Sequence, residues 1–177
     1  MINQGYINHV VLVLDASSSM SGISHEVIRV ADNLITHLAQ RSQEHNQETR
    51  ITVYKFNDTV ECLVYDKDVL RLPSMRELYR TSGMTALVDA TQKAIDDLKQ
   101  TATLYGDHAF LLYVLTDGEE NASRKTNSYT LQRTLKELPD NWTVAAMVPD
   151  QGGVFEAKKF GFSANNISIW DTTKKGI

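Results

Sequence analysis

Almost wholly apolar runs recur along the chain, and a polar residue follows each run within two positions. Three such runs cover residues 10–14, 109–115 and 142–148. A strand that is buried on both faces needs a run of this kind, as in a parallel sheet with helices on each side. The sequence therefore predicts three central strands of a mainly parallel sheet.

Segments with helical periodicity alternate with these strands. Apolar residues recur at the spacing of one helix face within residues 24–41, 86–100 and 128–137. Ser24 is expected to cap the first helix at its N-terminus. Strands that alternate with helices form βαβ units with right-handed crossovers, so we predict an α/β fold.

Two further runs, residues 51–56 and 60–65, are separated only by the polar residues 57–59. Such a short polar link is typical of a β-hairpin. One antiparallel strand is therefore expected at an edge of the sheet. Residues 167–170 have the pattern of a last strand.

The composition fits one globular domain and excludes several classes of protein. The chain has 177 residues, of which 42% are hydrophobic and 23% charged, so we predict a single domain over residues 1–177. A net charge of −4 argues against nucleic acid as the main partner. The single cysteine, Cys62, excludes an internal disulfide framework, and we expect it to fill space in a strand. No segment resembles a membrane span or a secretory signal, so we expect a cytoplasmic protein with no membrane partner.

Oxygen-bearing side chains gather where the predicted strands end. Asp15, Ser17 and Ser19 follow the first run, Asp117 follows the run 109–115, and Thr85 opens the helix before that run. Ligands of open α/β sheets bind at the carboxyl ends of neighbouring strands. Carboxylate and hydroxyl oxygens suit Mg²⁺ or Mn²⁺ and suit soft metals poorly. We therefore predict that these five side chains hold one divalent cation.

This donor set combines two carboxylates with three hydroxyls. Neutral ligands leave the charge of the ion under-compensated, so the ion attracts an anion from outside. We expect a Glu or Asp of a partner protein to serve as the last ligand. Each residue also has a simpler explanation, because Asp15, Ser17 and Thr85 can cap helices and Asp117 can belong to a turn. The coincidence of three such signals at one sheet edge favours the metal site.

The three segments together resemble the metal-ion-dependent adhesion site (MIDAS) of von Willebrand factor A-type domains. The segments are Asp-Ala-Ser-Ser-Ser at 15–19, Gly-Met-Thr-Ala-Leu-Val-Asp-Ala at 83–90 and Leu-Thr-Asp-Gly at 115–118. The resemblance implies a Rossmann-like, doubly wound sheet of about six strands in the order 3-2-1-4-5-6, with one antiparallel strand and helices on both faces. It also implies a non-catalytic module that binds another protein.

The resemblance assigns a role to each candidate ligand. In the family, the residues that match Ser17 and Ser19 coordinate the ion directly, and the one that matches Thr85 does so directly or through water. Those that match Asp15 and Asp117 often act through water. Family members usually end in a further helix, and we expect this closing C-terminal helix to be missing here because the sequence stops soon after residue 170.

Two alternative functions remain open. An Asp after a buried strand also begins haloacid-dehalogenase-type phosphatase sites, in which Asp15 would be the nucleophile. Such sites need a second carboxylate two residues later as the general acid, and the chain has Ser17 there. The second alternative is a scaffold domain whose metal site is only structural.

Two expectations concern residues outside this donor set. Glu119, Glu120 and Asn121 follow Asp117 closely, so we predict that they form the rim that selects the partner. The histidines show no spacing typical of metal ligands, and we expect them at the surface.

Overall fold

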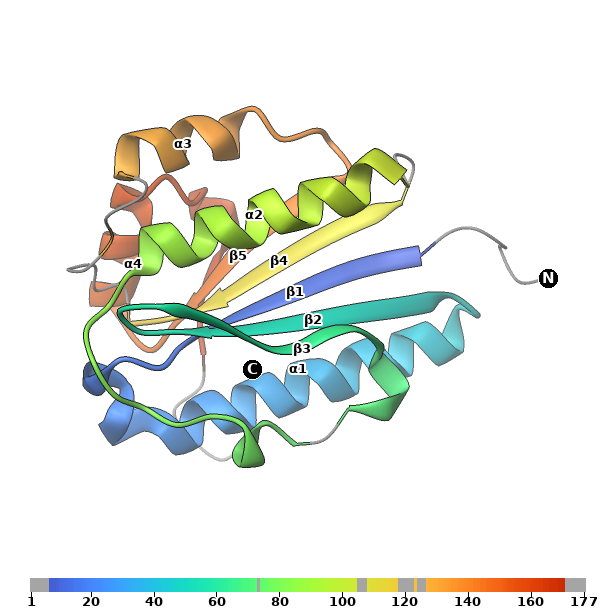
Figure 1. Cartoon of the computed structure of the whole chain (residues 1–177), viewed down its shortest axis with the longest axis horizontal. Helices are drawn as coiled ribbons and strands as arrows, with labels where there is room; N and C mark the ends of the chain where they lie inside the picture. The colour runs from blue at the N-terminus through green and yellow to red at the C-terminus, as the bar shows by residue number, and fades with distance from the viewer. Residues whose placement is uncertain (1–6, 73, 105–107, 118–122, 124–126, 171–177) are drawn as a thin grey trace.

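The computed structural model describes residues 7–72, 74–104, 108–117, 123 and 127–170, which form one sheet with helices on both faces (Figure 1). The strands lie in the order β3-β2-β1-β4-β5-β6. Of the strands formed by the described residues, only β3 is antiparallel to its neighbour. This arrangement confirms the predicted Rossmann-like sheet and its hairpin. The strands are β1 (Ile7–Asp15), β2 (Glu48–Phe56), β3 (Val60–Asp68), β4 (Ala109–Leu115), β5 (Trp142–Val148) and β6 (Ile167–Ile169).

Helices cover the sheet from two sides. Helix α1 lies on one face, and α2 and α3 lie on the other (Figure 1). The α-helices are α1 (Ser24–Glu44), α2 (Leu87–Leu104), α3 (Ser128–Lys136) and α4 (Gln151–Lys159). The described residues also include the short 3-10 helices η1 (Ser18–Ile23), η2 (Val69–Arg71), η3 (Met75–Glu77) and η4 (Ala164–Asn166). None of the described helices is both long enough and apolar enough to cross a membrane.

The central strand β1 shows why its sequence is apolar throughout. Leu12 and Leu14 pack into the core under α1, whereas Val11 and Val13 pack into the core under α2. Successive side chains of a strand point to opposite faces, so a strand covered on both sides needs apolar residues at every position. The same strand then carries Asp15 to the carboxyl edge of the sheet.

One local prediction was wrong, and one helix was not predicted. Ser24 is the first residue of α1 and not its cap, because η1 runs directly into α1 and places Ile23 at the N-cap position without a side-chain hydrogen bond. Helix α4 was not predicted, since Gly152 and Gly153 disfavour a helix. Asp150 nevertheless caps α4, and its carboxylate accepts a hydrogen bond from the Gly153 amide at 2.9 Å.

Gly153 has a packing reason to be glycine. A Cβ atom at this position would lie 2.7 Å from Cβ of Val148, which real Cβ atoms do not tolerate. The absence of a side chain therefore lets α4 pack closely against β5. Tertiary contact thus overrides the weak helix propensity of the two glycines.

Two predictions about burial were wrong. Cys62 is exposed on the edge strand β3 and fills no space in the core. His9 and His108 are buried, and His9 Nε2 lies 3.0 Å from His108 Nδ1. The His9 ring also stacks on Phe110, so aromatic packing at the start of β1 and β4 accounts for this burial. The other three histidines are exposed as expected (His25, His37 and His45).

Candidate metal site

The backbone brings two of the three candidate segments to one edge of the sheet. Strands β1 and β4 are parallel neighbours in which Leu14 pairs with Leu115, so the residues that follow both strands emerge together. Side chains carried by these two strand ends are therefore within reach of one another.

The third segment comes from far along the chain and lies against the loop after β1. The amide of Ser18 donates a hydrogen bond to the carbonyl of Gly83 at 2.9 Å, and the amide of Ser82 donates to the carbonyl of Ala16 at 2.7 Å. Gly83 adopts a φ of 76°, in the left-handed region that favours glycine. These contacts hold the segment that contains Thr85 beside the loop that contains Ser17 and Ser19.

Asp15 is fully buried at the centre of this arrangement. Its Oδ1 accepts hydrogen bonds from the Ser17 amide at 3.0 Å and from Ser17 Oγ at 2.5 Å. Its Oδ2 accepts a hydrogen bond from Thr116 Oγ1 at 2.7 Å. Both carboxylate oxygens are thus fixed in direction. Thr116 was missed by sequence analysis, although its position directly after a buried strand was a usable signal.

The hydroxyl groups of Ser17 and Ser19 lie close enough to share one cation. Their Oγ atoms are 3.1 Å apart. Neighbouring ligands of an octahedral Mg²⁺ ion lie about 2.9 Å apart, given metal–oxygen distances of about 2.0–2.1 Å. Ser17 also donates its proton to Asp15, so the lone pairs of its oxygen remain available to a metal. The donor chemistry therefore fits Mg²⁺ or Mn²⁺.

Burial makes the charge of Asp15 costly. It raises the pKa of this carboxyl to about 6, although the hydrogen bonds from Ser17 and Thr116 oppose the rise and the charge of Asp117 adds to it. Among the ion pairs of the described residues, none involves Asp15. A cation bound beside this carboxylate would remove the cost.

Tyr79 contacts the backbone of the site through a hydrogen bond. Its buried hydroxyl donates a hydrogen bond to the carbonyl oxygen of Asp15. Burial, together with the charges of Asp15 and Asp117, raises the pKa of Tyr79, so its hydroxyl remains a neutral donor. Sequence analysis missed this residue, because nothing in the local sequence links it to Asp15.

The remaining predicted residues occupy different positions. Thr85 is buried two residues before the start of α2, and Asp117 is half-buried directly after Thr116. The predicted rim residues Glu119, Glu120 and Asn121 lie outside the described residues. Among the residues that are described, no group of three or more His, Cys, Asp or Glu side chains could hold a metal ion. The predicted site does not meet that count, because three of its five ligands are hydroxyls.

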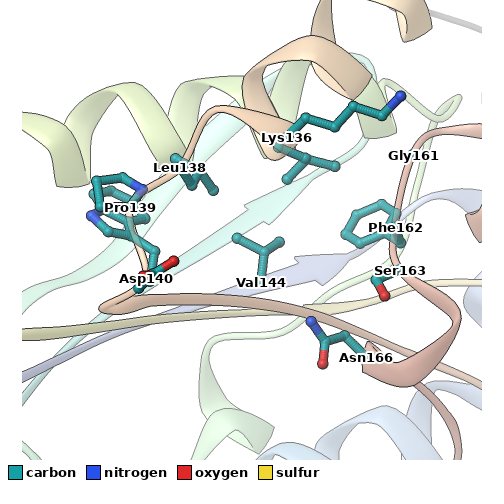
Figure 2. Close-up of a pocket in the computed structure, with 11 residues that line it drawn as sticks. Lys136, Leu138, Pro139, Asp140, Val144, Gly161, Phe162, Ser163 and Asn166 are labelled. Carbon is teal, nitrogen blue, oxygen red and sulfur yellow. The ribbon is translucent and has the colours of Figure 1, made fainter.

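A pocket of about 500 Å³ lies away from this site (Figure 2). The end of α3, the first half of β5 and the segment after α4 line it, with Lys136 and Asp140 as its charged groups. Residue 142 of β5 pairs with residue 110 of β4, and residue 110 pairs with His9, so this pocket belongs to the amino end of the strands. It contains none of the candidate metal ligands and does not extend their site.

The family of the chain follows from its sequence. A sequence profile of the von Willebrand factor type A domain matches residues 10–120, which include all five candidate ligands and more than half of the chain. The chain belongs to this family. The sheet order and the antiparallel strand β3 of the described residues are those expected of an A-type domain.

Solved structures share the fold of this A-type domain at low sequence identity. Proximal thread matrix protein 1 from the mussel byssus is 18% identical with a TM-score of 0.59, and the match covers 93% of this chain and 41% of that protein. The pilus adhesin SpaC from Lactobacillus rhamnosus GG is 13% identical with a TM-score of 0.66, and the match covers 96% and 28%. The ArnB paralog VWA2 from Sulfolobus acidocaldarius is 18% identical with a TM-score of 0.54, and the match covers 96% and 42%.

These structures are larger than the chain described here, which spans less than half of each. Another structure of the mussel protein, with a TM-score of 0.63 and 17% identity, has a zinc-occupied MIDAS motif; the match covers 93% of this chain and 41% of that one. A search of curated protein sequences returned no significant match.

Proposed function

We propose that this A-type domain is a non-catalytic binding module that captures an acidic residue of a partner protein through a bound Mg²⁺ or Mn²⁺ ion. Asp15, Ser17, Ser19, Thr85 and Asp117 would hold the ion. The ion would supply an electrophilic coordination position for the carboxylate of the partner. The burial of Asp15, with no basic side chain paired to it among the described residues, carries this proposal, because a buried anion needs a compensating cation.

The structure gives less support to a phosphatase with Asp15 as its nucleophile. Both oxygens of Asp15 accept hydrogen bonds. The position of the general acid holds Ser17, whose hydroxyl donates a hydrogen bond to Asp15 itself. A serine hydroxyl does not act as a general acid near neutral pH. The mussel protein with zinc in its MIDAS motif and the SpaC adhesin are consistent with a binding role.

Calorimetric titration with Mg²⁺ is the direct test of the proposal. We expect one ion to bind to the wild-type domain, and we expect Asp117→Ala to weaken its affinity by about 10–100-fold, as for residues that act on a metal through water. Asp140→Ala is the matched control, because Asp140 is exposed and lines the pocket at the other end of the sheet. Absence of binding heat with a folded wild-type sample, checked by circular dichroism, would contradict the proposal.

Thr85→Ala is expected to weaken capture of an acidic ligand far more than it weakens folding. Thr85 would complete the ligand shell through its hydroxyl, and Thr85→Ala removes only one hydroxyl and one methyl group from a buried position. The probe is a fluorescein-labelled hexaglutamate peptide, and its affinity in Mg²⁺ should fall at least about tenfold, which corresponds to about 1.4 kcal/mol.

Two measurements separate capture from stability in this variant. In a chelator, urea unfolding should show that Thr85→Ala loses much less unfolding free energy than a core truncation such as Leu112→Ala. Thr85→Ser keeps the hydroxyl and should retain most of the affinity for the peptide. If Thr85→Ala unfolded as easily as Leu112→Ala, the role of Thr85 would be structural.

A further inference from the structure

A second pocket adjoins the candidate metal site. It has a volume of about 550 Å³, and it lies between the start of α1 and the segment that leads to α2. Tyr79 joins the two places, since it lines the pocket and donates its hydroxyl hydrogen bond to the carbonyl of Asp15. The lining residues are Ser24, His25, Ile28, Arg76, Tyr79, Arg80 and Thr81.

The pocket has a basic lining in a protein of net negative charge. Arg76 and Arg80 are exposed, and neither forms an ion pair with another described residue. Arg80 Nη1 donates to the carbonyls of Arg76 and Tyr79, each at 3.0 Å, which holds its guanidinium against the segment before α2. The other donors of that planar group remain able to bind an anion in a bidentate manner.

The start of α1 adds to this positive character. Ser24 and His25 are the first residues of α1, and no side chain caps the helix at Ile23. The N-terminus of a 21-residue helix carries a partial positive charge and favours negative groups nearby. The same first turn also holds Glu26, whose carboxylate accepts a hydrogen bond from Trp170 Nε1 at 3.0 Å, so the contribution of the helix is smaller than that of the two arginines.

We infer that the acidic partner of the metal site places a second carboxylate in this pocket, against Arg76 and Arg80. The inference rests on the proposed function and adds to it a preference for a segment with at least two acidic side chains. One carboxylate would complete the shell of the metal, and the other would bind the guanidinium groups beside Tyr79. Charge complementarity across two adjacent subsites selects such a segment over a single acid.

The experiment measures fluorescence anisotropy with two labelled probes in saturating Mg²⁺. One probe is hexaglutamate, and the other is a glycine–serine hexapeptide that contains one glutamate. We expect wild-type domain to prefer hexaglutamate, and we expect Arg76→Gln/Arg80→Gln to weaken hexaglutamate binding by at least about tenfold. Affinity for the single-glutamate peptide and for Mg²⁺ alone should change by less than about twofold.

A charge-matched variant separates local binding from the net charge of the protein. Lys67→Gln/Lys158→Gln removes two positive charges from exposed positions on β3 and α4, and it should leave the preference for hexaglutamate intact. Arg76→Gln alone should still lower that preference. This single variant is decisive because the Arg76 guanidinium makes no hydrogen bond or ion pair with any other described residue, so its loss removes no internal support.

The outcomes distinguish this inference from the function on which it rests. If wild-type domain binds neither probe in an Mg²⁺-dependent manner, both the function and the inference are wrong. If Mg²⁺-dependent binding occurs but the arginine variants match wild type, only the inference is wrong. Equal weakening by the lysine variant would show a general charge effect and would also overturn the inference.

Discussion

Asp15→Asn is expected to abolish Mg²⁺ binding and to stabilise the metal-free domain. The folded protein raises the pKa of Asp15 from 3.8 to about 6. A difference of this size corresponds to about 3 kcal/mol of lost stability when the carboxyl is ionised. Asparagine removes the buried charge while its oxygen still accepts from Ser17, and its amide group can donate to Thr116, whose hydroxyl then accepts.

Calorimetric titration measures the loss of Mg²⁺ binding, and urea unfolding in a chelator near neutral pH measures the gain in stability. Wild-type domain should gain stability when Mg²⁺ is added, whereas the variant should gain none. Asp140→Asn, at an exposed position, should behave as wild type in both conditions. A variant that was less stable than wild type in the chelator would show that the fold itself stabilises the carboxylate.

Asp15 is expected to lower the stability of the metal-free domain and to be needed for metal binding, and its surroundings show why. The hydrogen bonds from Ser17 and Thr116 orient Asp15 but do not offset the cost of its burial. The second carboxylate nearby, Asp117, adds repulsion. A metal ion would reverse both effects, so binding would be coupled to the stability of this edge of the sheet.

The sequence predicted the central strands well, and the physical reason lies in their burial. Strands β4 and β5 begin and end at the predicted residues 109–115 and 142–148, because strands covered on both faces are apolar at nearly every position; the exposed Thr143 of β5 is the exception. The α4 helix was missed because its close packing on Val148 required Gly153, and glycine argues locally against a helix. The 3-10 helix η1 was also missed, since its residues 18–23 carry no helical pattern of apolar positions.

The segments that carry the candidate ligands could be predicted to meet, because two of them follow the carboxyl ends of predicted neighbouring strands and the third opens a helix beside them. Thr116 and Tyr79 could not be assigned with similar ease. The contact of Thr116 with Asp15 depends on the register between β1 and β4, and that of Tyr79 depends on the path of a segment 64 residues later in the chain. The pair of His9 and His108 was missed for the same reason, because its members are 99 residues apart. Such contacts depend on tertiary structure: the local sequence places Thr116 directly after a buried strand but does not identify its partner, and it gives no signal for Tyr79.

The pH dependence of stability is the second large effect, and two buried groups drive it in opposite directions. In the absence of metal, Asp15 contributes stability below its unfolded pKa of about 3.8, and this contribution is lost as the pH rises through about 6. Burial and the neighbouring His108 lower the pKa of His9 below 6.5. His9 therefore contributes stability above about pH 6.5 that is lost as the pH falls through its folded pKa. The two contributions partly cancel in wild-type domain.

Comparison of wild type with Asp15→Asn across pH separates the two groups. In a chelator, the variant should exceed wild type by about 3 kcal/mol above pH 6, and the difference should shrink toward zero near pH 4, because protonated Asp15 resembles asparagine. The variant itself should lose stability in acid through His9. In saturating Mg²⁺ the difference above pH 6 should change sign, because only wild type binds the ion. A difference that stayed constant between pH 4 and pH 7 would show that Asp15 does not titrate in this range and that its burial is compensated within the protein.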